Sequence, residues 1–278
     1  MADSTVEMVR TGEVVESAKI VEVVRPELVH HVPPYTVLAS IYDGVMRHVN
    51  YRRWAAFVRE VAAENGVATG RVLDIACGTG SFLSHFMRKA FLGYGCDHSR
   101  EMVLVAREKL AGKRGYRLAW VADMRALGTR GPYDLVVCLY DSINYLDKLS
   151  DYGIVFRQVA DVLRPGGLFV FDVCTVENSL INFDGYRDGG RVGRMEFVRY
   201  SHFDRGTGVQ VNEFLIGLRG KLKEEAFLEV HRQWIRPLEL VRREVEESPL
   251  ELLAVYDDFS HRRGTESSLR VHFVCRKR

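Results

Sequence analysis

Residues 72–80, Val-Leu-Asp-Ile-Ala-Cys-Gly-Thr-Gly, constrain the fold more than any other part of the chain. The run begins with the apolar, β-branched residues that are typical of a buried parallel strand, and Asp74 interrupts it. Because burying an unpaired acid costs roughly several kcal/mol, we expect Asp74 to have a polar partner. Gly78 and Gly80 allow positive φ angles and a close backbone approach, and residues 81–89 have the composition of a helix. The run therefore predicts a strand–turn–helix unit that faces a nucleotide-like ligand.

The spacing of the glycines excludes two common phosphate-binding loops. The dinucleotide motif Gly-x-Gly-x-x-Gly fails in both registers, which give Ala, Gly, Ser from Ala76 and Gly, Gly, Leu from Gly78. A P-loop needs a Lys directly after its last glycine, and no Lys follows Gly80 before Lys89. An ordinary strand-to-helix turn of another doubly wound protein remains the structural alternative.

Residues 74–80 resemble the first motif of class I S-adenosylmethionine-dependent methyltransferases, with Ala76 where that family often has Gly. Residues 41–54, which contain Tyr-x-x-Trp, resemble the N-terminal helices of glycine N-methyltransferase. Asp123-Met-Arg125 and Tyr145-Leu146 resemble N-methyltransferases that act on nucleotide-linked amino sugars. The resemblance is close over residues 42–175 and covers residues 35–278 in outline.

The resemblance implies S-adenosylmethionine as the cofactor and S-adenosylhomocysteine as the product. Asp97 ends the second strand, where a doubly wound nucleotide site places the acid that accepts both ribose hydroxyls. Asp123 and Met124 are expected at the adenine, Leu139 and Tyr140 at the methionine end, and Arg47 at the cofactor carboxylate. The full predicted set of cofactor-binding residues is Tyr35, Tyr42, Arg47, Asp74, Ala76, Cys77, Gly78, Gly80, Asp97, His98, Met102, Asp123, Met124, Leu139 and Tyr140.

Methyl transfer from a sulfonium requires mainly that the protein hold the acceptor and exclude water. An amine acceptor must also lose a proton before it attacks, and a nearby base helps. Tyr145 and His231 are the predicted catalytic residues, with Asp141 and His202 as alternatives, although a histidine on a sheet face can be purely structural. Residues 141–144, Asp-Ser-Ile-Asn, lack the Asp/Asn-Pro-Pro-aromatic motif of nucleobase methyltransferases.

The predicted fold class is α/β, with a Rossmann-like, seven-stranded, mostly parallel sheet that carries helices on both faces. Its last strand is antiparallel, and a small antiparallel β insertion follows the fifth strand. We expect an N-terminal extension over residues 1–34 and a cofactor-binding core over residues 35–175. The extension is either a partly disordered arm or a helix with one face formed by Val14, Val15, Ala18, Val21 and Val24. Residues 176–236 are expected to form a substrate-selecting β cap, and residues 237–278 to complete the core.

The composition is that of a cytoplasmic protein that folds without a metal or a disulfide. A chain of 278 residues that is 47% hydrophobic can bury a substantial core, and its five cysteines show no paired or metal-binding spacing. The net charge is only +2, and the sequence has no apolar stretch of membrane-spanning length. We expect no signal peptide, because Met-Ala-Asp-Ser at residues 1–4 lacks the basic and apolar regions of one. We therefore expect a small-molecule partner, no nucleic acid and no membrane. The N-terminal extension and the β cap are the expected surfaces if the chain forms a homo-oligomer.

The sequence therefore predicts an S-adenosylmethionine-dependent methyltransferase that modifies a small molecule, with an amine as the favoured acceptor. Two alternatives remain at this point. One is a non-catalytic S-adenosylmethionine-binding protein, and the other is an NAD-dependent Rossmann oxidoreductase, which the two failed glycine registers disfavour.

Overall fold

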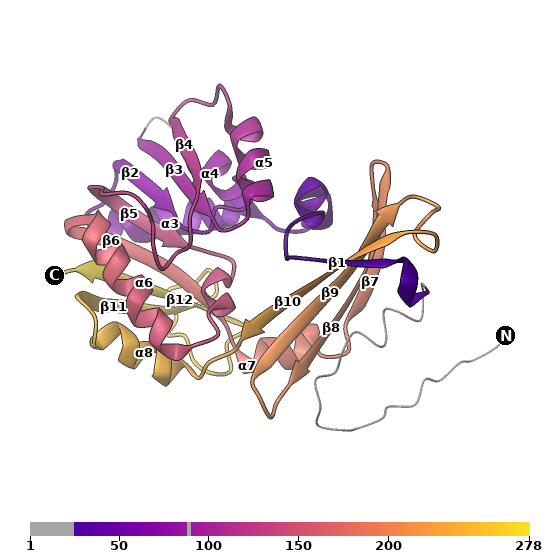
Figure 1. Ribbon diagram of the computed structural model, residues 1–278. Helices are drawn as coiled ribbons and strands as arrows, with labels where there is room; N and C mark the ends of the chain where they lie inside the picture. The colour runs from indigo at the N-terminus through magenta and orange to yellow at the C-terminus, as the bar shows by residue number, and fades with distance from the viewer. Residues whose placement is uncertain (1–24, 88–89) are drawn as a thin grey trace.

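The computed structural model describes residues 25–87 and 90–278, which form a seven-stranded sheet and a separate five-stranded sheet (Figure 1). The larger sheet has the strand order β11-β12-β6-β5-β2-β3-β4. Its neighbours are parallel from β6 to β4, whereas β12 is antiparallel to both β6 and β11. The predicted Rossmann-like sheet with an antiparallel last strand is thus confirmed. Its strands are β2 (Gly70–Asp74), β3 (Phe91–Asp97), β4 (Tyr116–Val121), β5 (Tyr133–Cys138), β6 (Leu163–Cys174), β11 (Leu250–Asp257) and β12 (Arg270–Lys277).

Helices cover both faces of this sheet, as predicted. Leu73 packs in the core with α6 (Leu149–Val162) and α8 (Leu238–Glu246), which lie in front of the sheet in Figure 1. The preceding residue, Val72, packs in a second core with α3 (Tyr51–Glu64), α4 (Ser81–Phe86) and α5 (Arg100–Leu110). Because successive side chains of a strand point to opposite faces, burial on both sides requires the continuous apolar run seen in the sequence.

Polar residues before two of the helices fix where each begins. The side chain of Ser99 accepts a 3.1 Å hydrogen bond from the amide of Met102 and caps α5, and Asn50 caps α3 in the same way through the amide of Arg53. Such caps are each worth about 1 kcal/mol. Met102 itself is only 1% exposed.

The smaller sheet is the predicted β insertion, here called the cap. Its strand order is β1-β10-β9-β8-β7, with antiparallel neighbours except for β1, which runs parallel to β10. The strands are β1 (Val29–Val32), β7 (Arg187–Val192), β8 (Met195–Asp204), β9 (Val209–Leu218) and β10 (Ala226–Trp234). A 3₁₀ turn, η1 (Pro26–Leu28), precedes β1, and η3 (Ser142–Tyr145), α7 (Val176–Asn178) and the π-helical turn η4 (Ser179–Phe183) follow β5 and β6.

The N-terminal part of the chain differs from the predicted extension. Residues 29–32 join the cap by pairing with residues 226–229, about two hundred positions away, and a four-residue strand carries too short a pattern to reveal such a pairing. The predicted helical face between Val14 and Val24 lies outside the described residues. Within the described part of the chain, no helix is long and apolar enough to span a membrane.

Residues 33–46, here called the strap, connect the cap to the core and appear in indigo between the two sheets in Figure 1. They contain η2 (Leu38–Ser40) and the short helix α2 (Tyr42–Val45). Apolar strap residues pack against Phe197, Phe214 and Ile216 of the cap. At the core end, Asp43 accepts hydrogen bonds from Thr79 and Ser81 and lies 2.5 Å from the ammonium of Lys109. Burial alone would raise the pKa of Asp43, but these partners hold it below its ordinary value.

Candidate active site

A cavity of about 710 Å³ lies at the carboxyl edge of the seven-stranded sheet, beneath the strap and the cap. Parallel α/β sheets bind ligands at this edge because the loops that leave the strands converge there. The cavity combines the loops after β2, β3, β4 and β5 with tyrosines of the strap and with inward-facing residues of β9 and β10. Segments that are far apart in the sequence therefore line the same cavity.

Most of the residues predicted from the sequence line this cavity. They are Tyr35, Tyr42, Asp74, Ala76, Cys77, Gly78, Asp97, His98, Met102, Asp123, Met124, Leu139, Tyr140, Tyr145 and His231. Gly80 and Arg47 are not among the described lining residues. Gly80 begins α4 at φ 76°, where an added Cβ would lie 2.8 Å from Leu110, so its role is close packing. Arg47 follows the end of α2 and is exposed, so we do not include it in the proposed cofactor site.

Asp97 and the glycine turn form one end of the site. The carboxylate of Asp97 accepts a 2.8 Å hydrogen bond from the amide of Gly78 and a 2.9 Å hydrogen bond from the amide of Ser99. Burial raises the pKa of Asp97 above its ordinary value, and these amides partly offset that effect. A Cβ on Gly78 would meet no atom within 4 Å, so the backbone leaves room here for a ligand. The arrangement fits a ribose.

Asp74 lies in the wall of the same cavity with little to neutralise it. It is 2% exposed, and it accepts a long hydrogen bond of 3.4 Å from the amide of Ala76. Burial raises its pKa to about 7. A buried carboxyl group with unused acceptor capacity beside a glycine turn fits the ammonium group of an amino acid. Together with Asp97, it gives the cavity acceptors that suit the ammonium group and the ribose of an adenosyl amino acid.

Asp123 lies at the end of β4 and is held by Arg125. The guanidinium of Arg125 contacts Asp123 at 2.7 Å and Asp151 of α6 at 2.8 Å. Hydrogen bonds from Arg125 hold the pKa of Asp123 below its ordinary value. Asp123 is therefore a fixed, ionised acceptor, which suits recognition of an exocyclic amino group.

A chain of hydrogen bonds, here called the relay, crosses the opposite side of the cavity. The hydroxyl of Tyr35 lies 2.6 Å from that of Tyr145, which lies 3.0 Å from Nδ1 of His231. Nε2 of His231 lies 3.2 Å from Oε2 of Glu229. Burial raises the pKa of both tyrosines well above the ordinary value, so their hydroxyls stay protonated. The relay thus ends in a histidine and a carboxylate.

Sequence reasoning missed Glu229, although the sequence contains a usable signal. Glu229, His231 and Gln233 alternate along β10, and all three are buried. Period-two alternation places them on one face of the strand, where buried polar groups must have partners. Three buried polar residues at this spacing indicate a network of polar contacts on that face of the strand.

The alternative bases Asp141 and His202 lie differently. Asp141 is 2.6 Å from the guanidinium of Arg270 and accepts a 2.5 Å hydrogen bond from Gln233, so its carboxylate is already committed. His202 is not among the described residues that line the cavity. Of the four candidates, Tyr145 and His231 are therefore the pair that the geometry favours.

Arg270 of β12 also contacts Asp172, and this buried cluster shapes the turn after β5. Asp172 accepts the amides of Tyr140 at 2.6 Å and of Asp141 at 2.9 Å. Tyr140 and Asp141 have φ angles of 62° and 50°, a left-handed conformation that is uncommon for residues other than glycine. Strained backbone of this kind persists only where surrounding contacts hold it, and here it brings Tyr140 to the cavity wall.

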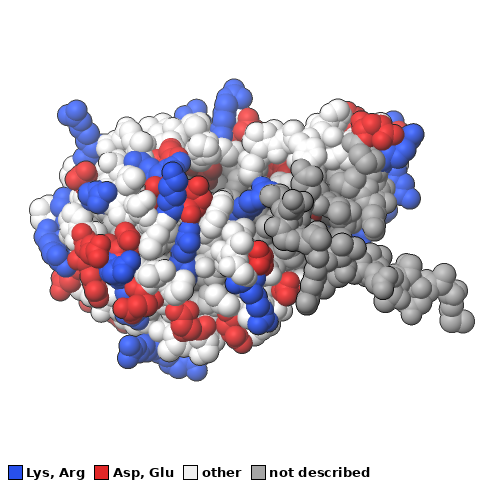
Figure 2. Space-filling view, turned by 60° about the horizontal axis from the view of Figure 1, so that its bottom comes forward, with Lys and Arg blue, Asp and Glu red and all other residues white. Residues whose placement is uncertain are grey.

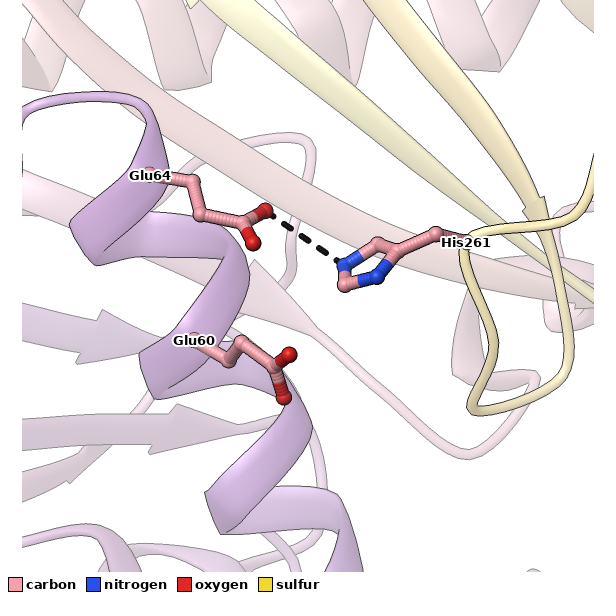
Figure 3. Close-up of side chains that lie close together, drawn as sticks. All are labelled: Glu60, Glu64 and His261. Atoms are coloured by element: carbon pink, nitrogen blue, oxygen red, sulfur yellow. Dashed lines mark ion pairs between the residues drawn. The ribbon is translucent and has the colours of Figure 1, made fainter.

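Glu60 and Glu64 of α3 and His261 from the connection between β11 and β12 form a separate group on the surface (Figure 3). Glu64 and His261 are 3.4 Å apart, and all three residues are exposed. None of them belongs to the described lining of the cavity. An exposed ion pair contributes little to stability. On the face seen in Figure 2, basic and acidic side chains are interspersed rather than separated by sign.

Comparisons with known proteins agree with this geometry. Residues 72–167 match the family model described as a methyltransferase domain. The putative methyltransferase YqeM of Bacillus subtilis (strain 168) is 29% identical over 249 residues, which cover 87% of this chain and 97% of the relative. A dTDP-3-amino-3,4,6-trideoxy-alpha-D-glucopyranose N,N-dimethyltransferase of Streptomyces venezuelae is 27% identical over 191 residues, which cover 62% of this chain and 78% of the relative.

The fold is also that of a solved methyltransferase. The crystal structure of an S-adenosylmethionine-dependent methyltransferase from Clostridium acetobutylicum ATCC 824 superposes with a TM-score of 0.74 at 23% identity and covers 87% of this chain and 98% of that one. The predicted class I methyltransferase, its cofactor and its resemblance to nucleotide-sugar N-methyltransferases are confirmed by these findings taken together.

Proposed function

We propose that this S-adenosylmethionine-dependent methyltransferase methylates the amino group of a small molecule in the cavity beneath the strap and the cap. The observation that carries the proposal is the relay from Tyr35 through Tyr145 to His231, which offers a proton acceptor inside the cavity. An amine that binds as an ammonium ion needs such an acceptor before its nitrogen can attack. The similarity to an amino-sugar N,N-dimethyltransferase supports the same class of acceptor.

We assign the cofactor to the side of the cavity formed by the loops after β2, β3 and β4. Asp74 would contact its ammonium group, Asp97 its ribose hydroxyls and Asp123 its adenine amino group. The open space beside Gly78 would let the cofactor approach the backbone of the turn closely. When bound, S-adenosylmethionine supplies a sulfonium methyl group, and transfer forms a bond from nitrogen to carbon as the bond from sulfur to carbon breaks.

The relay removes one proton from the acceptor. The ammonium of the acceptor donates to the Tyr35 hydroxyl, which passes its own proton to Tyr145, which in turn passes its proton to Nδ1 of His231. Because burial keeps both phenols neutral, they transmit the proton and His231 holds it. The balance is one neutral amine and one imidazolium beside Glu229.

The cap side of the cavity would bind the rest of the acceptor. It presents Tyr186, Arg199, Asn212 and Phe214, and Arg199 is paired through two hydrogen bonds of 2.8 and 2.9 Å with Asp188. Aromatic rings exclude water from the reacting groups and favour a cationic product. This mixture of rings and amide groups fits a small, partly polar amine rather than a polymer.

The test is formation of S-adenosylhomocysteine by the purified protein with matched panels of amines, alcohols and carboxylic acids. We expect product with amines only, and a loss of kcat of roughly 10²-fold or more in His231→Ala. Tyr145→Phe should lower kcat while leaving the affinity for S-adenosylmethionine unchanged. Turnover with alcohols alone would contradict the proposal. Tight cofactor binding with no turnover in any panel would instead favour the non-catalytic alternative.

A further inference from the structure

We propose that Glu229 is a positioning residue that makes proton acceptance by His231 depend on the strap being seated over the cavity. This inference rests on the proposed function, since it concerns the same relay. It assigns a role to a residue that touches neither the acceptor nor the cofactor, because Glu229 is not among the described residues that line the cavity.

Glu229 is completely buried, and its carboxylate contacts four hydrogen-bond donors. Oε1 accepts the amides of Val37 at 2.6 Å and Leu38 at 2.9 Å. Oε2 accepts the amide of Tyr35 at 2.6 Å and lies 3.2 Å from Nε2 of His231. Three of the four donors are therefore backbone amides of the strap, and the fourth is the proposed proton acceptor.

The contact with Glu229 fixes the protonation pattern of the imidazole. An ionised carboxylate can only accept hydrogen bonds, so Nε2 of His231 carries the proton that it shares with Oε2. In the neutral ring, Nδ1 is then the acceptor, and it faces the hydroxyl of Tyr145 at 3.0 Å. The opposite tautomer would present an N–H group to Tyr145 and could not take up a proton from the relay.

Tyr35 closes the hydrogen bonds into a ring. Its hydroxyl begins the relay at Tyr145 and its amide binds Glu229, so this strap residue joins the first member of the relay to the last. Its φ angle of 64° is the left-handed conformation that non-glycine residues adopt only under constraint. If the strap lifts, the Tyr35 hydroxyl leaves the relay and Glu229 loses three donors together. The complete relay therefore exists only when the strap covers the cavity.

The first experiment measures backbone hydrogen exchange, which does not depend on knowing the acceptor. Glu229→Gln should increase exchange at the amides of Tyr35, Val37 and Leu38 by roughly tenfold or more, because the amide side chain offers one acceptor oxygen where the carboxylate offered two. The amides of β2 and β5 should stay protected, which shows that the core is folded. Glu196→Gln is the matched control: Glu196 lies on β8 of the same sheet and accepts the amide of Gly220 at 3.0 Å. Unchanged strap exchange in Glu229→Gln would overturn the proposal.

The second experiment asks whether Glu229 acts through His231. With an amine that the wild-type protein methylates, Glu229→Gln and His231→Ala should each lower kcat. The kcat of the double variant should lie within about threefold of that of His231→Ala alone. Losses that multiply would assign Glu229 an independent role and contradict the proposal. If Glu229→Gln does not fold, Tyr35→Phe replaces it, because this variant keeps the amide contact with Glu229. It should then lower kcat without increasing strap exchange.

The two experiments separate failure of the inference from failure of the proposed function. If the wild-type protein methylates no amine, the proposed function is wrong, but hydrogen exchange still decides whether Glu229 holds the strap. If amines are methylated and the double variant loses kcat multiplicatively, the function stands and the coupling through Glu229 is refuted.

Discussion

The amide of Gly78 donates a 2.8 Å hydrogen bond to Oδ2 of Asp97. This bond joins the turn after β2 to the end of β3, two points 19 residues apart in the sequence. Asp97 therefore shapes the glycine turn as well as facing the cavity. Its other oxygen accepts the amide of Ser99, which itself caps α5, so one carboxylate organises three neighbouring segments.

Asp97→Ala is expected to weaken binding of S-adenosylmethionine by roughly 1.5 to 3 kcal/mol, or about 10- to 150-fold, since hydrogen bonds to a charged acceptor are lost. Titration calorimetry measures the change. Asp204→Ala is a suitable control because Asp204 is the exposed last residue of β8 in the cap, and its loss should leave the affinity unchanged. Unaltered affinity in Asp97→Ala would refute the ribose assignment.

Gly78→Val should abolish cofactor binding while the protein remains folded. Gly66→Val offers a matched comparison, because both glycines have positive φ angles, 50° and 84°, and neither would place a Cβ within 4 Å of another atom. Both variants should lose a similar free energy of unfolding, on the order of 1 to 2 kcal/mol, from left-handed strain. Of these two glycines, Gly78 is the one that lines the cavity. Normal binding by Gly78→Val would therefore show that the cofactor lies elsewhere.

Asp74→Asn should stabilise the cofactor-free protein at pH 8 and weaken cofactor binding. Burial raises the pKa of Asp74 from 3.8 to about 7 in the folded state. With a raised pKa, the contribution of this acid to stability is complete below pH 4 and declines as pH rises to 7. The neutral amide avoids that loss. The gain in unfolding free energy, on the order of 1 to 3 kcal/mol at pH 8, should shrink at pH 5.

Denaturant unfolding at both pH values measures this effect, and calorimetry measures the accompanying loss of affinity. Equal stability of Asp74→Asn and the wild type at pH 8 would mean that the buried carboxyl group has a partner even without the cofactor. Unchanged affinity would remove Asp74 from the proposed contact with the ammonium group.

Arg270→Met should destabilise the protein by about 3 to 5 kcal/mol at pH 8, because it leaves the carboxylates of Asp141 and Asp172 buried without a cation. Burial raises the pKa of both acids, which Arg270 partly offsets. Protonation at lower pH relieves the unpaired charge, so the destabilisation should diminish towards pH 5. Arg164→Met breaks a half-exposed pair with Asp134 and should cost less than about 1 kcal/mol at either pH. A penalty in Arg270→Met that is independent of pH would contradict this account.

Local sequence was sufficient to predict a residue's role wherever both its residue type and its position relative to a strand indicate that role. The acid, small residue and glycines of residues 74–80 specify a strand, a tight turn and a helix by their own conformational preferences. Asp97 and Asp123 were predictable for the same reason, since each lies at or just beyond the carboxyl end of its strand, and parallel strands bring such positions to one edge. The seven-stranded, mostly parallel sheet with its antiparallel last strand and the β insertion could likewise be predicted.

The relay depends on tertiary structure. Glu229 contacts amides that are more than 190 positions away in the sequence, and no local pattern records which carboxylate will accept them. Arg47 illustrates the same point. Its guanidinium has the right chemistry to bind the cofactor carboxylate, but the residue follows the end of α2 and is exposed to solvent. The sequence determined the fold and the edge of the sheet at which we propose the cofactor binds, since strands and turns form through short-range preferences. The packing of the strap between the two sheets decided which side chains meet in the cavity, because those contacts exist only after distant segments have closed over one another.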